Sequence, residues 1–122
     1  MQKYLDIMNH FGLKSQKRKL NEECYEFLEA VTDYEELVCE NESYDYPYTA
    51  EELDIFRDHI VEEMGDMLIL LTQFIARYNI SKEELDEWMD YKLLRTEHRI
   101  RTGYYDEDEN VCIEKEKITK AN

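Results

Sequence analysis

Two short acidic patterns hold the candidate catalytic and metal-binding residues: NEECYE at residues 21–26 and VEEMGD at residues 61–66. Each holds an acid pair three residues apart, Glu23 with Glu26 and Glu63 with Asp66. On a helix such a pair projects from one side. At about 100° per residue, each pair flanks the apolar stripe of its own segment and does not lie opposite it. If the two segments pack as antiparallel helices, four carboxylates converge.

Converging carboxylates repel one another, and burial raises that cost. A divalent cation removes it, and ligation by carboxylate oxygens alone suits Mg²⁺ or Mn²⁺, with water and phosphate oxygens in the remaining positions. The alternative is that these acids form a solvated surface, because 30 of the 122 residues are Asp or Glu. The matching of two pairs beside two apolar stripes favours a metal site.

A di-iron centre is the structural rival, and it requires a Glu-x-x-His motif on two helices. The residues three positions before His10, His59 and His98 are Ile, Phe and Arg. The motif is therefore missing, and a hard divalent cation is favoured. His59 lies one turn before Glu63 and is either a neighbour of the site or an ordinary exposed histidine.

Half of the basic residues fall in two short windows, one before the first acid pair and one near residue 100. The first contains Lys14, Lys17, Arg18 and Lys19, and the second contains Lys92, Arg95, Arg99 and Arg101. In the second window the spacing of three and four places Lys92, Arg95 and Arg99 on one helix face. They either stabilise a helix C-terminus or, with Lys19, hold the phosphates of a ligand beside the metal.

The elements that must position these groups are helices, since the chain has only three Gly and one Pro and its apolar residues recur every three to four positions. We expect helices over about 1–10, 15–39, 49–78 and 81–99. Gly12 should break the first, Ser15 should cap the second, and Thr49–Glu52 and Ser81–Glu84 should form capping boxes. Residues 1–101 then form one all-α domain, and 102–122 a tail or arm.

The segment from Met67 to Leu71 is apolar on every side of its helix, so it must be covered on every side. Four helices of one short chain cannot do this easily. We therefore expect an antiparallel helical bundle of about four helices, completed by homo-oligomerisation as a dimer or tetramer.

The net charge of −15 argues against binding to nucleic acid polymers or anionic membranes. The three cysteines show no zinc or disulfide spacing, and no apolar run is long enough to span a bilayer. A cytoplasmic location is the natural expectation.

The acidic segments, KLNEECYEFLEAV and HIVEEMGDMLILL, together resemble the MazG-like all-α nucleoside triphosphate pyrophosphohydrolases, whose signature is EExxE followed by EExxD. The following segment, ISKEELDEWMDYKLLRTEHR, is similar to that family's next helix with its K-x-x-R element. The resemblance covers about residues 14–101.

The resemblance implies Mg²⁺-dependent hydrolysis of (deoxy)nucleoside triphosphates to the monophosphate and pyrophosphate. The ligands it implies are Glu23, Glu26, Glu63 and Asp66, the phosphate-binding residues are Lys92 and Arg95, and the candidates to position or deprotonate water are Glu22 and Glu62. Two alternatives stay open: a helical module that binds nucleotides without cleaving them, and a structural helical dimer whose acids are solvated.

Overall fold

The computed structural model describes residues 1–43 and 48–103, without the side chain of Ser43. All regular structure in these ranges is helical, with no strand: α1 (Gln2–Phe11), α2 (Leu13–Ser43), α3 (Ala50–Arg77) and α4 (Lys82–Thr102). The expectation of an all-α chain with about four helices is therefore confirmed. Most of the predicted tail, residues 104–122, lies outside the described residues.

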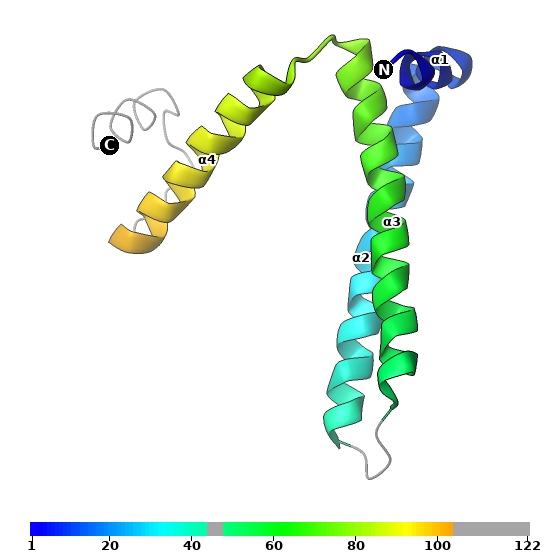
Figure 1. Cartoon of the computed structure of the whole chain (residues 1–122), viewed down its shortest axis with the longest axis vertical. Coiled ribbons are helices and arrows are strands. Elements are labelled where there is room, and N and C mark those ends of the chain that lie inside the picture. The colour runs from blue at the N-terminus through cyan, green and yellow to red at the C-terminus, as the bar shows by residue number, and fades with distance from the viewer. Residues whose placement is uncertain (44–47, 104–122) are drawn as a thin grey trace. The chain divides into compact units, whose positions relative to one another are not determined.

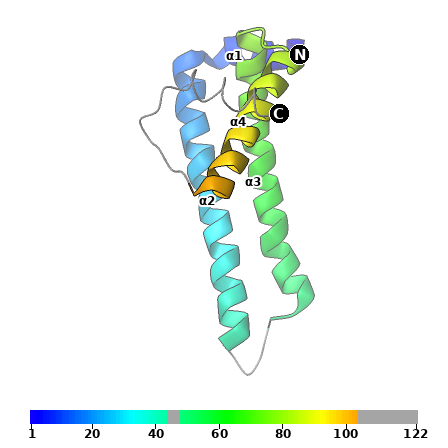
Figure 2. The same ribbon diagram turned by 90° about the vertical axis from the view of Figure 1, so that its left-hand side faces the viewer.

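The helices belong to two compact units, residues 1–79 with α1, α2 and α3, and the chain from Ile80 on with α4. Within the first unit, α2 and α3 lie side by side along much of their length, and α1 packs against both (Figures 1 and 2). Gln16 near the start of α2 contacts Gln73 near the end of α3, while Glu23 and Glu26 face Glu63. Residue numbers thus rise along α2 and fall along α3, so the two helices form a hairpin.

Gly12 separates α1 from α2 because its φ of 89° is unfavourable for residues with a side chain. Its N–H donates to the carbonyl of Met8, and its own carbonyl accepts from the N–H of Gln16 at 3.0 Å. The second helix therefore starts directly after Gly12, and the prediction that Ser15 caps it is wrong. It also continues past Cys39 to Ser43, because residues 40–43 contain neither Gly nor Pro to end it.

Side chains cap both later helices, and of the two predicted capping boxes the structure shows the full box at Ser81 and one of the two hydrogen bonds at Thr49. The Thr49 hydroxyl accepts from the backbone N–H of Glu52 at 3.2 Å at the start of α3. Ser81 and Glu84 form a full capping box at the start of α4. Gly103 ends α4 in the left-handed conformation, with φ 67°.

The seam between α2 and α3 is unusually polar. Its buried residues are Gln16, Glu23 and Ala30 on α2, and Glu63, Leu70 and Gln73 on α3. The spacing of seven on α2 is close to two helical turns, so these three residues form one line that faces α3. Four of the six most deeply buried side chains in the seam are thus polar or charged.

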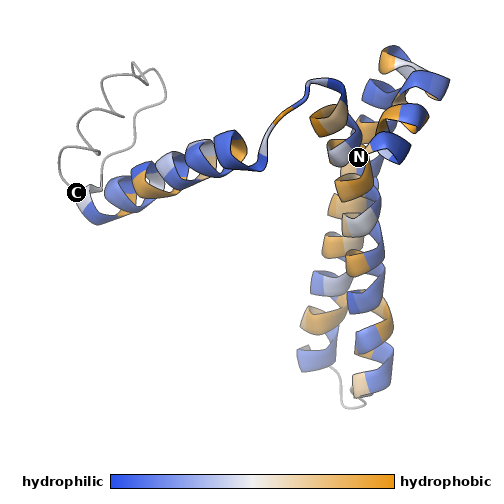
Figure 3. Cartoon of the chain, turned by 45° about the horizontal axis from the view of Figure 1, so that its top comes forward, coloured by the Kyte–Doolittle hydropathy of each residue, from blue (hydrophilic) through white to orange (hydrophobic). Residues whose placement is uncertain are grey.

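Apolar side chains that are only half-buried, such as Phe27 on α2 and Ile60 on α3, flank these positions, and others lie further from the seam. A groove along one side is lined by Leu20 and Cys24 of α2 and by Leu71 of α3, with Lys17 and Arg18 at its edge. Leu28, one turn after Cys24, and Met64, two turns before Leu71, continue this line. We call Leu20, Cys24, Leu28, Met64 and Leu71 the apolar face. Figure 3 shows how strongly hydrophobic the second half of α3 is.

By the same helical geometry, Glu26 and Asp66 lie on the other side of the seam from the apolar face. The hairpin is therefore two-sided, with carboxylates along one side and exposed apolar groups along the other. Among the helices that the structure describes, none has the length and hydrophobicity needed to cross a membrane.

The capping box of α4 gives a pH-dependent prediction. The Glu84 carboxylate accepts the backbone N–H of Ser81 at 2.8 Å, and this hydrogen bond holds the pKa of Glu84 below its ordinary value. Its contribution to stability is present above the ordinary pKa of glutamate and is lost as the pH falls through the lowered pKa. In NMR spectra, the Ser81 amide shift should titrate with a midpoint below about 4.3, the ordinary value.

The matched control is Glu84→Gln, which keeps an acceptor oxygen but cannot titrate. In that variant the Ser81 amide shift should stay constant over the same pH range. A wild-type midpoint at or above the ordinary glutamate pKa contradicts the prediction.

Candidate metal centre

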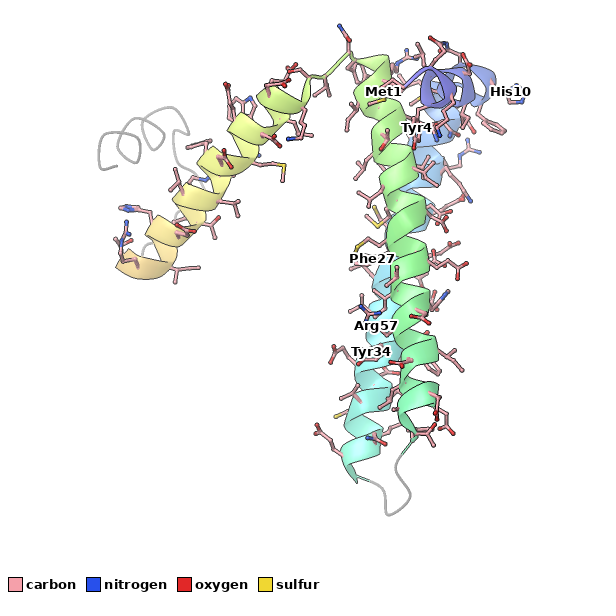
Figure 4. The ribbon with its side chains drawn as sticks, viewed as in Figure 1. Met1, Tyr4, His10, Phe27, Tyr34 and Arg57 are labelled. Carbon is pink, nitrogen blue, oxygen red and sulfur yellow. The ribbon has the colours of Figure 1, made fainter. Side chains whose placement is uncertain are left out.

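Three of the four predicted metal ligands meet across the α2–α3 seam. Carboxylate oxygens of Glu23, Glu26 and Glu63 all lie within 4.8 Å of one another. Glu23 and Glu63 are buried in the seam, with 5% and 7% of their surface exposed, while Glu26 is exposed at its edge. Figure 4 marks the level of this cluster by Phe27, the residue next to Glu26.

Each buried carboxylate has one oxygen with a neighbouring positive or titratable group and one oxygen without a partner. Glu23 Oε1 accepts from Lys19 Nζ at 2.9 Å, and Glu63 Oε1 lies 3.8 Å from His59 Nε2. The Oε2 atoms of Glu23 and Glu63 are buried and have no hydrogen-bond partner among the described residues. Buried polar atoms normally have a partner, so these two oxygens are candidate donors to a ligand.

The electrostatics of the cluster agree with this geometry. Burial raises the pKa of Glu63, and the neighbouring Glu26 carboxylate raises it further. His59 opposes that shift, while Asp66 and Glu23 add to it. The hydrogen bond to Glu23 raises the pKa of Lys19 in turn. The cluster thus holds more negative charge than its own cations neutralise, as expected of a site for an added cation.

The fourth predicted ligand, Asp66, is half-buried one turn after Glu63 on α3. Its charge acts on Glu63, but its carboxylate is not one of the three that lie within 4.8 Å of one another. The role of Asp66 as a fourth ligand therefore stays a prediction.

The two predicted water-activating residues lie at the margin of the cluster. Glu22 is exposed, 3.9 Å from Lys19 Nζ, and Glu62 is exposed, 3.7 Å from the Nδ1 of His59. Lys19, predicted to contact substrate, bonds Glu23 in this structure.

The three basic residues predicted to bind phosphate lie on α4. Lys92 is exposed, and Arg95 and Arg99 are half-buried; the Arg95 guanidinium lies 5.4 Å from the centre of the Tyr91 ring. They share one face of α4, as the spacing predicted. Since α4 belongs to the second unit, their pairing with the acid cluster stays a prediction.

One feature of the seam was not anticipated from the sequence. The side-chain amide of Gln16 donates to the Oε1 of Gln73 at 2.8 Å, and both residues are buried. The available signal was the spacing of seven that joins Gln16, Glu23 and Ala30, which marks one line on α2.

The residues present fit a hard divalent cation. All three converging donors are carboxylates, the set that Mg²⁺ and Mn²⁺ prefer. Comparison of the chain with models of protein families, with curated proteins and with solved structures finds no match in any of the three. The chemistry of the site must therefore be judged on its own geometry.

The unneutralised cluster predicts an unusual stability effect. Glu63→Gln removes one buried charge but keeps the shape of the side chain, so in EDTA its melting temperature should exceed that of the wild type by several degrees. Added Mg²⁺ should raise the melting temperature of the wild type, because a ligand of the folded state stabilises it, and should have little effect on the variant.

The control is Glu36→Gln, which removes the same charge from an exposed position on α2. It should melt close to the wild type and keep the response to Mg²⁺. Identical wild-type melting curves in EDTA and in millimolar Mg²⁺ or Mn²⁺ would exclude the metal centre.

Proposed function

We propose that the α2–α3 hairpin binds Mg²⁺ or Mn²⁺ and hydrolyses (deoxy)nucleoside triphosphates to the monophosphate and pyrophosphate. Glu23, Glu26 and Glu63 hold the cation, and Asp66 completes the set. The observation that supports this best is that carboxylate oxygens of Glu23, Glu26 and Glu63 lie within 4.8 Å of one another, while Glu23 and Glu63 each have a buried oxygen without a partner in the described part of the chain. The resemblance of the two acidic segments to MazG-like enzymes supplies the substrate class.

When bound, the cation supplies charge that polarises the α-phosphate and lowers the pKa of a water molecule. The proton of the attacking water passes to a carboxylate of the chain. Water attacks the α-phosphorus, the bridging bond to the β-phosphate breaks, and Glu22 or Glu62 accepts the proton. Both carboxylates are exposed beside the cluster, where water reaches them.

Lys92, Arg95 and Arg99 offset the charge on the departing pyrophosphate in this proposal. Three cations on one face of α4 match the several oxygens of a polyphosphate better than they match a single carboxylate. Because arginine donates in a planar fork, Arg95 and Arg99 are suited to bidentate contacts with phosphate.

We further propose that the apolar face is covered by a second copy of the chain, which completes an antiparallel helical bundle. Leu28, Met64 and Leu71 are 61%, 44% and 42% exposed, and together they form an exposed apolar patch on one side of the hairpin. The opposite side, with Glu26 and Asp66, stays open to substrate in such an assembly. The free thiols of Cys24 and Cys39 fit a reducing cytoplasm.

The reaction is tested with a panel of nucleoside triphosphates in Mg²⁺, with monophosphate and pyrophosphate separated by chromatography. At least one triphosphate should yield both products in equal amounts. Glu63→Gln should lower the rate by at least about 100-fold, because loss of a direct ligand exceeds the usual 10- to 100-fold effect of a neighbour's loss.

The control is again Glu36→Gln, which should hydrolyse at the wild-type rate. Unchanged turnover in excess EDTA contradicts the mechanism. Tight calorimetric binding with only intact nucleotide recovered would instead favour a binding module without hydrolysis.

The proposed assembly is tested by light scattering coupled to size exclusion. The wild type should have at least about twice the chain mass of 14.9 kDa. Leu28→Glu combined with Leu71→Glu should give monomers, because each substitution places a charge within the apolar face. The matched control, Leu28→Met combined with Leu71→Met, should stay assembled. A monomeric wild type at tens of micromolar would contradict the proposed assembly.

A further inference from the structure

The buried amide pair, Gln16 with Gln73, has no role in the proposed chemistry. The two side chains are 5% and 2% exposed and share a hydrogen bond of 2.8 Å. They lie in the same seam as the acid cluster, Gln16 two turns before Glu23 on α2 and Gln73 almost three turns after Glu63 on α3. Burial of two amides costs free energy unless they bond each other, so their presence at this point requires a reason.

The other contacts of the seam do not specify how far α2 is slid along α3. Apolar contacts are non-directional, and residues 67–71 offer an apolar side chain in every direction. The carboxylates of Glu23, Glu26 and Glu63 repel one another, which favours any slide that separates them. Neither force therefore selects the register in which the acids meet.

A hydrogen bond between two buried amides does select a register. A slide of one turn, about 5.4 Å, would part Gln16 from Gln73 and leave both amides buried without a partner. A buried polar pair between helices is the best-attested device for fixing register. The pair also lies at the end of the hairpin away from the connection between α2 and α3, so the two constraints act at opposite ends.

We propose that the Gln16–Gln73 hydrogen bond is a positioning pair that sets the register of α2 on α3 and so holds Glu23 and Glu26 opposite Glu63 against their mutual repulsion. The cation-binding consequence rests on the function proposed above, whereas the register itself does not. Gln16 and Gln73 touch neither cation nor substrate in this role.

The decisive variant replaces both glutamines by leucine. Removal of both partners leaves no unpaired amide, so the double variant should melt at or above the wild-type temperature. Its register should nevertheless be lost. Leu70→Ala is the matched control, because it removes buried volume from the same seam and keeps the amide pair. That control should melt lower and keep the register.

Register is measured as the distance between spin labels at Lys14 on α2 and Arg57 on α3, both exposed, in full-length protein without its native cysteines. Labelled chains are diluted with unlabelled ones, so that distances within one chain dominate. Wild type and Leu70→Ala should give one narrow distance. The double leucine variant should give a distribution broadened or shifted by about one turn, 5.4 Å.

Affinity for Mn²⁺ is measured on the same unlabelled proteins. The Mn²⁺ affinity should fall at least about 10-fold in the double leucine variant and stay unchanged in Leu70→Ala. If the glutamine pair only stabilised the fold, the two variants would not differ in this way. An unshifted, narrow distance in the double variant overturns the proposal. So does a shift caused by Met8→Ala alone, which would show that α1 holds the register through its fully buried Met8.

The two proposals fail in different ways. If the wild type binds no Mn²⁺, the proposed function is wrong, but the spin-label distances still test whether the amide pair sets the register. If the wild type binds Mn²⁺ and the double variant keeps both its distance and its affinity, the register proposal falls alone.

Discussion

The dominant physical feature of the hairpin is the burial of like charges between α2 and α3. Glu23 and Glu63 occupy positions in the seam that a stable helical pair would normally fill with apolar residues. Of the other deeply buried side chains there, Gln16 and Gln73 are polar and only Ala30 and Leu70 are apolar. The helix α1 packs against both helices of the hairpin. In the proposed function, a cation offsets the buried charges and a second copy of the chain covers the apolar face.

The distribution of residues on the hairpin reflects that feature. Leu28, Met64 and Leu71 of the apolar face are exposed, while Glu23 and Glu63 are buried. An ordinary amphipathic helical pair would bury such apolar side chains and expose the acids. The proposed cation site and the proposed assembly are therefore linked, since the arrangement that collects carboxylates in the seam also leaves an apolar surface to be covered.

The sequence predicts much of this fold because helices have strong local signals. Gly12, Thr49 and Ser81 mark helix ends through backbone conformation and capping, and each acts where predicted. The position of the acid pairs beside the apolar stripes predicted that four carboxylates converge, and three of them, Glu23, Glu26 and Glu63, lie within 4.8 Å of one another. The start of α2 was mispredicted because Ser15 has the chemistry of a cap, while the carbonyl of Gly12 already accepts the first helical hydrogen bond. The Gln16–Gln73 bond joins residues 57 apart, and no local pattern encodes such a contact.

Lys19 connects the charge of the cluster to its proposed chemistry. Its ammonium group neutralises Glu23 in this structure, yet the side chain is 51% exposed, and the bond joins residues one turn apart on the helix surface. Because Glu23 is buried, loss of this partner alone would leave an uncompensated charge in the seam. In the proposed function, a cation that binds Glu23 takes the place of Lys19, so that the charge of Glu23 stays neutralised. The ammonium group then remains within the same turn of α2, where we propose that it contacts phosphate.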